Sequence, residues 1–408
     1  MVMSDRSSWG RAPHALAIAD ETYDDGEPAG RGLIAIRPIT QGEPIFEVPE
    51  NLILTKQTAI EHFSSVANLL NDVDEYVALA MLLIDERNKG EASFWKPYLD
   101  ILPPDEELIP LFRWSDEELG LLKGSPTLVA CTSLKQKLRK EYQTAVETVF
   151  EQHPSVFPLD VYSFEAWEWA FAVLFSRAIL LRKESTLALV PYADLLNHNP
   201  FCTSYIDMER RILRKDKYVG FFVDRPYAKM NQIFVTYGPK SNTELLLLYG
   251  FLVDRNPYDS VEISVALDED DPLFEKKKEI REQSNVGVVA KFPLFIDRYP
   301  MELIEYLRFC VATEKEFEKD FGEFIDEENE SLVASTIVKC CKDALKEYPQ
   351  SEEEDSALIA DRKLYKTLSL KARYAIRQRR NEKRILKRTI RNIEKEFEKP
   401  EYLFEKKS

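Results

Sequence analysis

The chain has 408 residues, 44% of them hydrophobic, and its formal net charge at pH 7 is −16. This length is enough for two or three domains, and the longest apolar run, YVALAMLLI at residues 76–84, is far shorter than the roughly 18 residues that span a bilayer. The acidic balance argues against non-specific binding to nucleic acid, which depends on clustered lysine and arginine, and it favours a basic protein partner.

The first third of the chain changes from strand-like to helical patterns. The N-terminal sequence has no apolar core of the kind that a signal peptide has, and its acidic residues argue against an intact transit peptide. From Gly30 to Thr55, β-branched runs are broken by glycine and proline, which predicts short strands joined by turns. Residues 57–181 have helical periodicity instead.

Two helix starts can be recognised within residues 57–181. Ser115 and Glu118 have the spacing of a capping box, and Ser163 is placed to cap a second helix. The apolar face predicted for that second helix comprises Phe164, Trp167, Phe171, Leu174, Ala178 and Leu181.

Short strand-like runs then return, with a short helix, NTELLLLYGF, before the last of them. The runs are residues 187–190, 218–223, 232–237 and 261–267. The acidic sequence LDEDD near Asp271 marks a boundary, beyond which the chain is mostly helical and more highly charged.

The closing segment, residues 363–399, predicts one long, solvated helix. Its arginines and lysines alternate with glutamates, so a nucleic-acid role for them is the weaker interpretation. The predicted apolar stripe comprises Leu386, Ile390, Ile393 and Phe397.

Five cysteines without a CxxC pair favour a reducing compartment and argue against a structural zinc site. The expected compartment is therefore the cytoplasm or the plastid stroma, with no bound metal. We also expect no membrane attachment, because the apolar runs are short, and a monomeric chain.

Three stretches carry polar or glycine residues that packing alone does not require. They are AGRGLIA at residues 29–35, PYADLLNHNP at 191–200 and IFVTYGPKSNTELLLLYGF at 233–251. Each has an ordinary explanation when taken singly: a tight turn for the glycines, loop hydrogen bonds for Asn197 and His198, and core packing for Tyr249.

Taken together and in this order, the stretches resemble the SET-domain methyltransferases, in the branch of the Rubisco large-subunit lysine methyltransferases and their non-histone relatives. The resemblance runs from GRGLIAIRPITQGEPIFEVP through WAFAVLFSRAI, LVPYADLLNHNP and KSNTELLLLYGF to NEKRILK, which is nearly the whole chain. It implies an α+β chain: a SET domain of short strands with a knot-like core at residues 14–267, with a helical insertion at about 57–160. A mostly helical substrate-binding domain would follow at residues 268–408.

The resemblance also implies which residues bind S-adenosylmethionine and which one faces its methyl group. The implied cofactor-binding residues are Gly30, Arg31, Gly32, Arg177, Asn197 and His198. Tyr249 matches the tyrosine that faces the methyl group and is the catalytic candidate. Asp194 would brace the cofactor loop and, with Tyr205 and Tyr258, belong to the substrate side.

The implied activity is S-adenosylmethionine-dependent methylation of lysine in a non-histone protein such as Rubisco large subunit or fructose-bisphosphate aldolase. Two alternatives stay open. One is methylation of a protein histidine, since a relative with this architecture modifies actin. The other is a catalytically inactive SET module that binds a partner, against which the presence of Asn197, His198 and Tyr249 argues.

Overall fold

Two compact units make up the computed structural model, which describes residues 15–24, 27–211, 216–283 and 287–396. Within those ranges the first unit comprises residues 15–114, 131–240 and 244–257, and the second comprises residues 115–130, 241–243 and 258–396. The domain boundary at 267/268 stays a prediction. No helix in the described ranges is long and apolar enough to cross a membrane.

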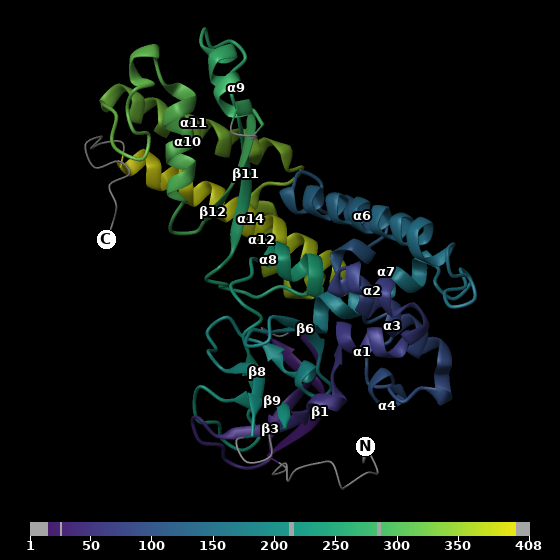
Figure 1. Ribbon diagram of the computed structural model, residues 1–408. Coiled ribbons are helices and arrows are strands. Elements are labelled where there is room, and N and C mark those ends of the chain that lie inside the picture. Colours follow the sequence, from purple (N-terminus) through teal and green to yellow (C-terminus); the bar gives the residue numbers. More distant parts are fainter. Residues whose placement is uncertain (1–14, 25–26, 212–215, 284–286, 397–408) are drawn as a thin grey trace. The chain divides into compact units, whose positions relative to one another are not determined.

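Short sheets, seen in the lower part of Figure 1, carry the polar motifs of the first unit. β1 and β2 form an antiparallel hairpin, β3-β9-β8 and β4-β6-β5 are three-stranded, and β7 pairs with β10 in parallel. Their shared core includes the fully buried side chains of Leu33, Val190 and Phe221. The strands are β1 (Leu16–Asp24), β2 (Glu27–Ala35), β3 (Pro44–Pro49), β4 (Leu54–Thr55), β5 (Ile179–Leu181), β6 (Thr186–Leu189), β7 (Asn197–His198), β8 (Tyr205–Arg210), β9 (Lys217–Phe222) and β10 (Phe234–Val235).

Helices of the first unit pack around α3, whose residues from Ala78 to Ile84 are all buried. Next to it, α7 begins where Ser163 accepts the backbone N–H of Ala166, as predicted. The helix ends at Arg177, however, and Leu181 belongs to β5, so the apolar face predicted to reach Leu181 was too long. The helices are α1 (Lys56–His62), α2 (Ala67–Asp72), α3 (Glu75–Lys89), α4 (Lys96–Leu99), α6 (Pro126–Ala145) and α7 (Phe164–Arg177).

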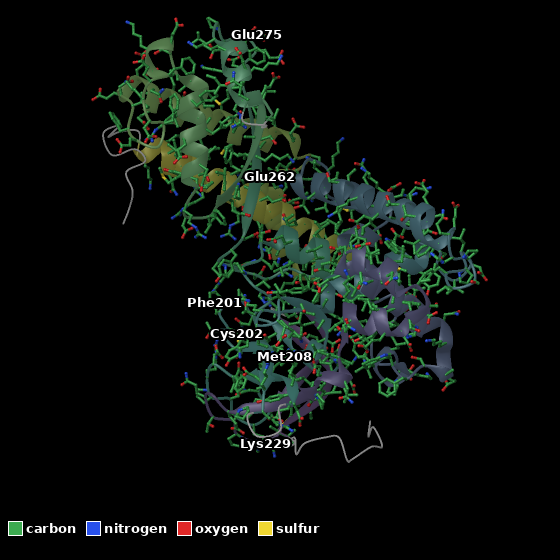
Figure 2. The ribbon with its side chains drawn as sticks, viewed as in Figure 1. Phe201, Cys202, Met208, Lys229, Glu262 and Glu275 are labelled. Carbon is green, nitrogen blue, oxygen red and sulfur yellow. The ribbon has the colours of Figure 1, made fainter. Side chains whose placement is uncertain are left out.

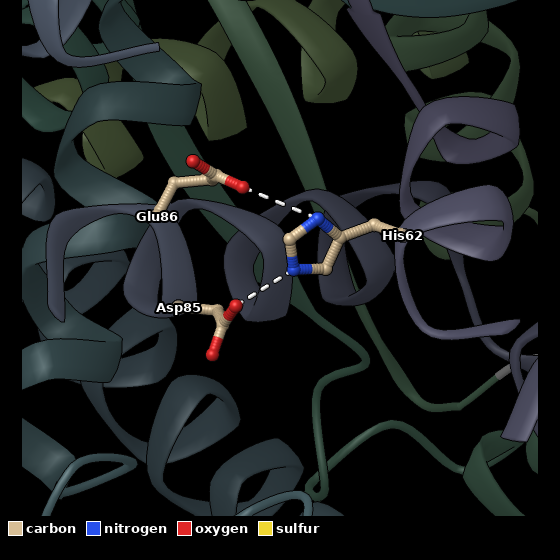
Figure 3. Close-up of side chains that lie close together, drawn as sticks. All are labelled: His62, Asp85 and Glu86. Carbon is tan, nitrogen blue, oxygen red and sulfur yellow. Dashed lines mark hydrogen bonds and ion pairs between the residues drawn. The ribbon is translucent and has the colours of Figure 1, made fainter. Parts of the chain in front are cut away.

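A charged cluster joins α1 to α3 (Figure 3). His62 at the end of α1 places Nε2 2.7 Å from Asp85 Oδ2 and Nδ1 3.2 Å from Glu86 Oε1. These three side chains are close enough to hold a metal ion. The ammonium of Lys89 already lies 2.9 Å from His62 Nε2 and 3.0 Å from an oxygen of each carboxylate, so a cation of the chain itself balances the charge.

Replacing His62 by glutamine is expected to lower the free energy of unfolding of the first unit by about 1–3 kcal/mol, because the buried Glu86 loses the imidazole nitrogen that lies 3.2 Å from its carboxylate. Burial raises the pKa of Asp85, but hydrogen bonds from His62 and Lys89 outweigh burial and bring that pKa below its ordinary value. The cluster therefore stabilises the folded state at pH values above the ordinary carboxyl pKa, and this contribution is lost as the pH falls. The free energy of unfolding of His62→Gln should then depend less on acid pH than that of the wild type.

Urea unfolding followed by tryptophan fluorescence measures the free energy of unfolding of the first unit, because the described tryptophans, residues 95, 114, 167 and 169, all lie in that unit. The control is Lys137→Gln, which removes one end of an exposed pair 3.7 Å from Glu141 and should change stability by less than about 0.5 kcal/mol. Equal stability of His62→Gln and the wild type would show that the cluster is unimportant.

The second unit combines a β-hairpin with helices. β11 and β12 pair along their whole length (Figure 1). Their buried side chains pack with those of α10, α11 and α14 in one core. The strand β12 was not predicted, because Lys291 and Pro293 interrupt its apolar residues and a proline within a run argues against a strand. The elements are α5 (Asp116–Gly120), α8 (Asn242–Glu244), β11 (Ser260–Ala266), α9 (Phe274–Gln283), β12 (Val289–Phe295), α10 (Met301–Val311), α11 (Glu327–Glu347), α12 (Glu352–Ala360), α13 (Arg362–Thr367) and α14 (Leu370–Glu396).

The predicted C-terminal helix is divided in two and is not fully solvated. α13 ends at Thr367 and α14 begins at Leu370. Leu386, Ile390 and Ile393 are buried as predicted, whereas Phe397 lies outside the described residues.

Charged residues of α14 are buried as well, which corrects the prediction of a solvated charged face. Glu382 is 1% exposed and accepts hydrogen bonds from Ser125, Thr127, Gln378 and Tyr348. Periodicity predicted the apolar stripe but could not reveal that segments distant in sequence supply these donors.

Candidate functional site

The β1–β2 hairpin and Asn197 form the base of the candidate site. Asn197 Nδ2 donates to the carbonyl of Arg31 at 3.3 Å and to the hydroxyl of Thr22 at 3.1 Å, and Thr22 donates to the carbonyl of Gly30 at 2.8 Å. A Cβ on Gly32 would lie 2.8 Å from Asn197 Nδ2. The close approach of the hairpin to Asn197 therefore requires glycine.

His198 is a neutral hydrogen-bond donor in this arrangement. Burial lowers the pKa of His198 to about 4, so the ring is uncharged at neutral pH. Its Nδ1 accepts the backbone N–H of Tyr237 at 3.0 Å, which leaves the proton on Nε2. That Nε2 is buried and has no hydrogen-bond partner among the described residues.

Three rings stack next to one another from His198 outward. His198 and Tyr237 have centroids 5.0 Å apart at 24°, and Tyr237 and Tyr249 have centroids 5.0 Å apart at 21°. Phe251 packs edge-on against Tyr237 and Tyr249. The Tyr237 hydroxyl donates to the carbonyl of Leu196 at 2.7 Å, which fixes the middle ring.

Both tyrosines of the stack are protonated at neutral pH. Burial, with smaller effects of Tyr76 and Glu244, raises the pKa of Tyr249 to about 12. Burial also raises the pKa of Tyr237 well above its ordinary value. The two phenols can therefore donate hydrogen bonds and orient a ligand, but they cannot act as strong bases.

A buried ion pair lies at the end of α7. Arg177 Nη1 is 3.0 Å from the carbonyl oxygen of Asp194 and 3.5 Å from its Oδ2. The hydroxyl of Tyr98, from α4, donates to the same Oδ2 at 2.8 Å. Burial raises the pKa of Asp194, against the opposing effects of Arg177 and Tyr98.

A cavity of about 490 Å³ opens beside the glycine hairpin, where the guanidinium of Arg31 donates to the carbonyl of Leu102 at 3.4 Å. Its lining comprises Arg31, Arg87, Gly90, Lys96, Leu99, Asp100, Leu102, Pro103, Pro104, Asp105 and Trp169. Arg31 thus has a side chain that lines this cavity in addition to the backbone carbonyl that Asn197 contacts.

The buried polar atoms of the site fit a zwitterionic ligand such as the amino-acid end of S-adenosylmethionine. Arg177 Nε and His198 Nε2 are donors, and Asp194 Oδ1 is an acceptor, and within the described ranges none of the three has a partner. Buried polar atoms in native proteins are nearly always paired, so the absence of a partner at three neighbouring residues points to a ligand.

These contacts place most of the predicted site residues in two groups. One group, connected through the hairpin and the ring stack, comprises Gly30, Arg31, Gly32, Asn197, His198 and Tyr249. The other is the pair of Arg177 and Asp194. Tyr205, by contrast, is 51% exposed on β8 and stacks on Phe222 of β9. Tyr258 belongs to the second unit.

The segment before Tyr205 is shown in Figure 2, where Phe201, Cys202 and Met208 are labelled. Phe201 is exposed, whereas Cys202 and Met208, the latter on β8, are buried. Tyr205 therefore lies on an exposed surface of the sheet rather than in the buried stack.

Sequence reasoning did not single out Tyr98 or Thr22, and it placed Tyr237 only at the end of the strand-like run 232–237. Tyr98 is 96 residues from its partner Asp194, and the sequence around it reads as an ordinary helix. In the structure Tyr237 lies two residues beyond β10.

Two family models match the chain. The SET domain matches residues 30–238, and the Rubisco LSMT substrate-binding domain matches residues 268–386. The chain is similar over nearly its whole length to a solved structure, the SET domain of LSMT bound to lysine and AdoHcy. The TM-score is 0.80 and the identity 26%, with 97% of this chain and 90% of the other covered.

Curated relatives also match the chain over most of its length. The chain is 29% identical over 401 residues to the tobacco Rubisco large subunit N-methyltransferase, covering 93% of this chain and 80% of the relative. It is also 29% identical over 378 residues to the aldolase-lysine N-methyltransferase of Arabidopsis thaliana, covering 88% and 76%. The human actin-histidine N-methyltransferase is 27% identical over 394 residues, and the match covers 64% of its length.

Proposed function

Since the chain belongs to the SET-domain family, we propose that it is an S-adenosylmethionine-dependent protein-lysine N-methyltransferase acting on an abundant non-histone protein. The observation that supports this most directly is the set of buried, unpartnered polar atoms on Arg177, Asp194 and His198 beside the ring stack, within the described ranges.

Each residue of the site has a distinct role in the proposal. Arg177 binds the carboxylate of the cofactor, a task for which a guanidinium is suited. Asp194 balances the positive charge of Arg177. Asn197 holds the glycine hairpin in place, and the neutral His198 donates its Nε2 proton. S-adenosylmethionine supplies an electrophilic methyl group on a sulfonium.

The tyrosines orient the lysine amine rather than deprotonate it. A free lysine has a pKa of about 10.4, so the acceptor must lose its proton before it can attack. A buried, apolar channel lowers that pKa, because burial disfavours the charged ammonium. Tyr249, whose pKa is raised to about 12 by burial, keeps its proton and can position the amine for an in-line approach.

The second unit provides the substrate-binding domain in this proposal, with its boundary near residue 268. Rubisco large subunit and fructose-bisphosphate aldolase are the candidate substrates, because relatives are named for acting on them. The same relatives are named as chloroplastic, so the plastid stroma is the proposed compartment.

Histidine methylation is the second candidate and is less well supported, since the relatives named for it are 27% identical against 29% for the lysine enzymes. An inactive SET module is the weakest alternative, because the stack and the unpartnered polar atoms would then have no purpose.

One experiment tests the activity and the substrate together. The protein is incubated with methyl-labelled S-adenosylmethionine and, in separate reactions, purified Rubisco, purified aldolase and a soluble extract of the source cells. Mass spectrometry then identifies the labelled residue. Label on lysine is expected; label on histidine would replace the assignment, and no label in any reaction would favour the inactive module.

Asn197→Ala and His198→Ala are each expected to weaken S-adenosylmethionine binding by about tenfold or more, because each removes a hydrogen-bonding group from the base of the site. Isothermal titration calorimetry measures the dissociation constants. A matched control is Asn381→Ala, on α14 of the second unit, which should bind the cofactor normally. Unchanged affinity in both folded site variants would remove the pair from the cofactor site.

A further inference from the structure

Tyr98 connects the helical region of the first unit to the candidate cofactor site. It lies on α4, its side chain is completely buried, and its hydroxyl donates to Asp194 Oδ2 at 2.8 Å. The neighbouring Leu99 lines the cavity beside the glycine hairpin. The short helix α4 therefore contributes one side chain to that cavity and another to the buried carboxylate.

The hydroxyl of Tyr98 makes the shortest hydrogen bond to the carboxylate of Asp194. Arg177 Nη1 is 3.5 Å from the same Oδ2 and bonds mainly to the backbone carbonyl of Asp194 at 3.0 Å. Oδ1 has no partner within the described ranges, although the side chain is only 1% exposed. Without the hydroxyl, the one side-chain hydrogen bond left to that carboxylate within the described ranges would be the 3.5 Å contact from Arg177.

We infer that Tyr98 is a positioning residue of the methyltransferase, whose hydroxyl fixes the carboxylate of Asp194 and thereby the Arg177 guanidinium that receives the cofactor. This inference rests on the proposed function. In this scheme Tyr98 touches neither the reacting atoms nor the rings of the stack, and it acts through Asp194.

The hydroxyl also affects the charge of Asp194. Burial raises the pKa of Asp194, and the hydrogen bond from Tyr98 is one of the interactions that oppose this rise. Removing the hydroxyl would raise the pKa further, so Asp194 would take up a proton at a higher pH. Protonation removes the negative acceptor that Asp194 Oδ1 offers to the ammonium of the cofactor, so cofactor affinity should then fall at a higher pH than in the wild type.

Tyr98→Phe tests the inference, because it deletes one oxygen and keeps the buried ring. The dissociation constant of S-adenosylhomocysteine is measured by calorimetry at intervals between about pH 5 and pH 8.5. We expect affinity to fall about tenfold at neutral pH, as for the loss of one buried hydrogen bond. The pH at which affinity is half lost should move upward. With saturating protein substrate, KM for S-adenosylmethionine should rise more than kcat falls.

The control is Tyr142→Phe, which removes a part-buried hydroxyl of the first unit, one that donates to the carbonyl of Tyr162 at 3.0 Å. A purely structural loss would affect both variants alike, whereas the inference expects normal affinity and a normal pH profile for Tyr142→Phe. In Tyr98→Phe/Asp194→Asn, affinity should be no lower than in Asp194→Asn alone, because the hydroxyl would have nothing left to fix.

Wild-type affinity and pH profile in folded Tyr98→Phe would overturn the inference. If Tyr98→Phe does not fold, Asp194→Asn tests the inference instead, because this variant must lose both the affinity for S-adenosylhomocysteine and its dependence on pH. An unaltered pH profile in Asp194→Asn would also overturn the inference. Failure of the wild-type protein to bind S-adenosylhomocysteine would instead contradict the proposed function.

Discussion

Tyr249→Phe is expected to reduce the rate of methyl transfer by about a hundredfold or more while cofactor affinity stays within a few-fold. Tyr249 stacks on Tyr237 at 5.0 Å, and the phenylalanine ring would keep that contact and the edge-on contact with Phe251. What is lost is a protonated phenol that orients the acceptor amine near the transition state. The cofactor contacts come from other segments and are preserved.

Single-turnover kinetics at saturating S-adenosylmethionine measure this step separately from product release. Tyr306→Phe is the control, because it removes a hydroxyl of the second unit that donates to the carbonyl of Val288 at 3.0 Å. It should transfer methyl groups at the wild-type rate. A near-normal rate in Tyr249→Phe would make Tyr249 a packing residue and move the catalytic assignment to Tyr237 or Tyr205.

Local chemistry made some elements of the fold predictable. Ser115 and Ser163 cap helices as their sequence signatures indicate, because such a cap depends on residues within one turn. The strand β12 and the break between α13 and α14 were not predicted. Both depend on packing within the second unit, which periodicity in a single segment does not report.

The candidate site could be predicted through resemblance rather than through spacing. Asn197 and His198 form a two-residue strand parallel to β10, a pairing that no local pattern indicates. The resemblance brought Asn197, His198 and Tyr249 together, and the structure links them through hydrogen bonds and the ring stack. Tyr98 stayed hidden because its partner is 96 residues away and no motif contains it.

Gly32→Ala is expected to reduce S-adenosylmethionine affinity by roughly a hundredfold, which corresponds to about 2.7 kcal/mol. The added methyl group would lie 2.8 Å from Asn197 Nδ2, 2.9 Å from Thr22 Cγ2 and 3.0 Å from Gln232 Nε2. All three atoms end side chains, and two of these side chains, Asn197 and Thr22, are held by hydrogen bonds to each other and to the hairpin, so the methyl group must displace them.

That movement would break the hydrogen bonds from Asn197 to Arg31 and Thr22, at 3.3 and 3.1 Å, and displace the adjoining His198. Calorimetry gives the affinity, and thermal melting shows whether the variant is folded. Gly120→Ala is the matched control, because no atom lies within 4 Å of its added Cβ, and it should bind normally. If folded Gly32→Ala bound the cofactor like the wild type, the hairpin could not be the cofactor-binding edge, and the base of the site would have to lie on the Arg177 side instead.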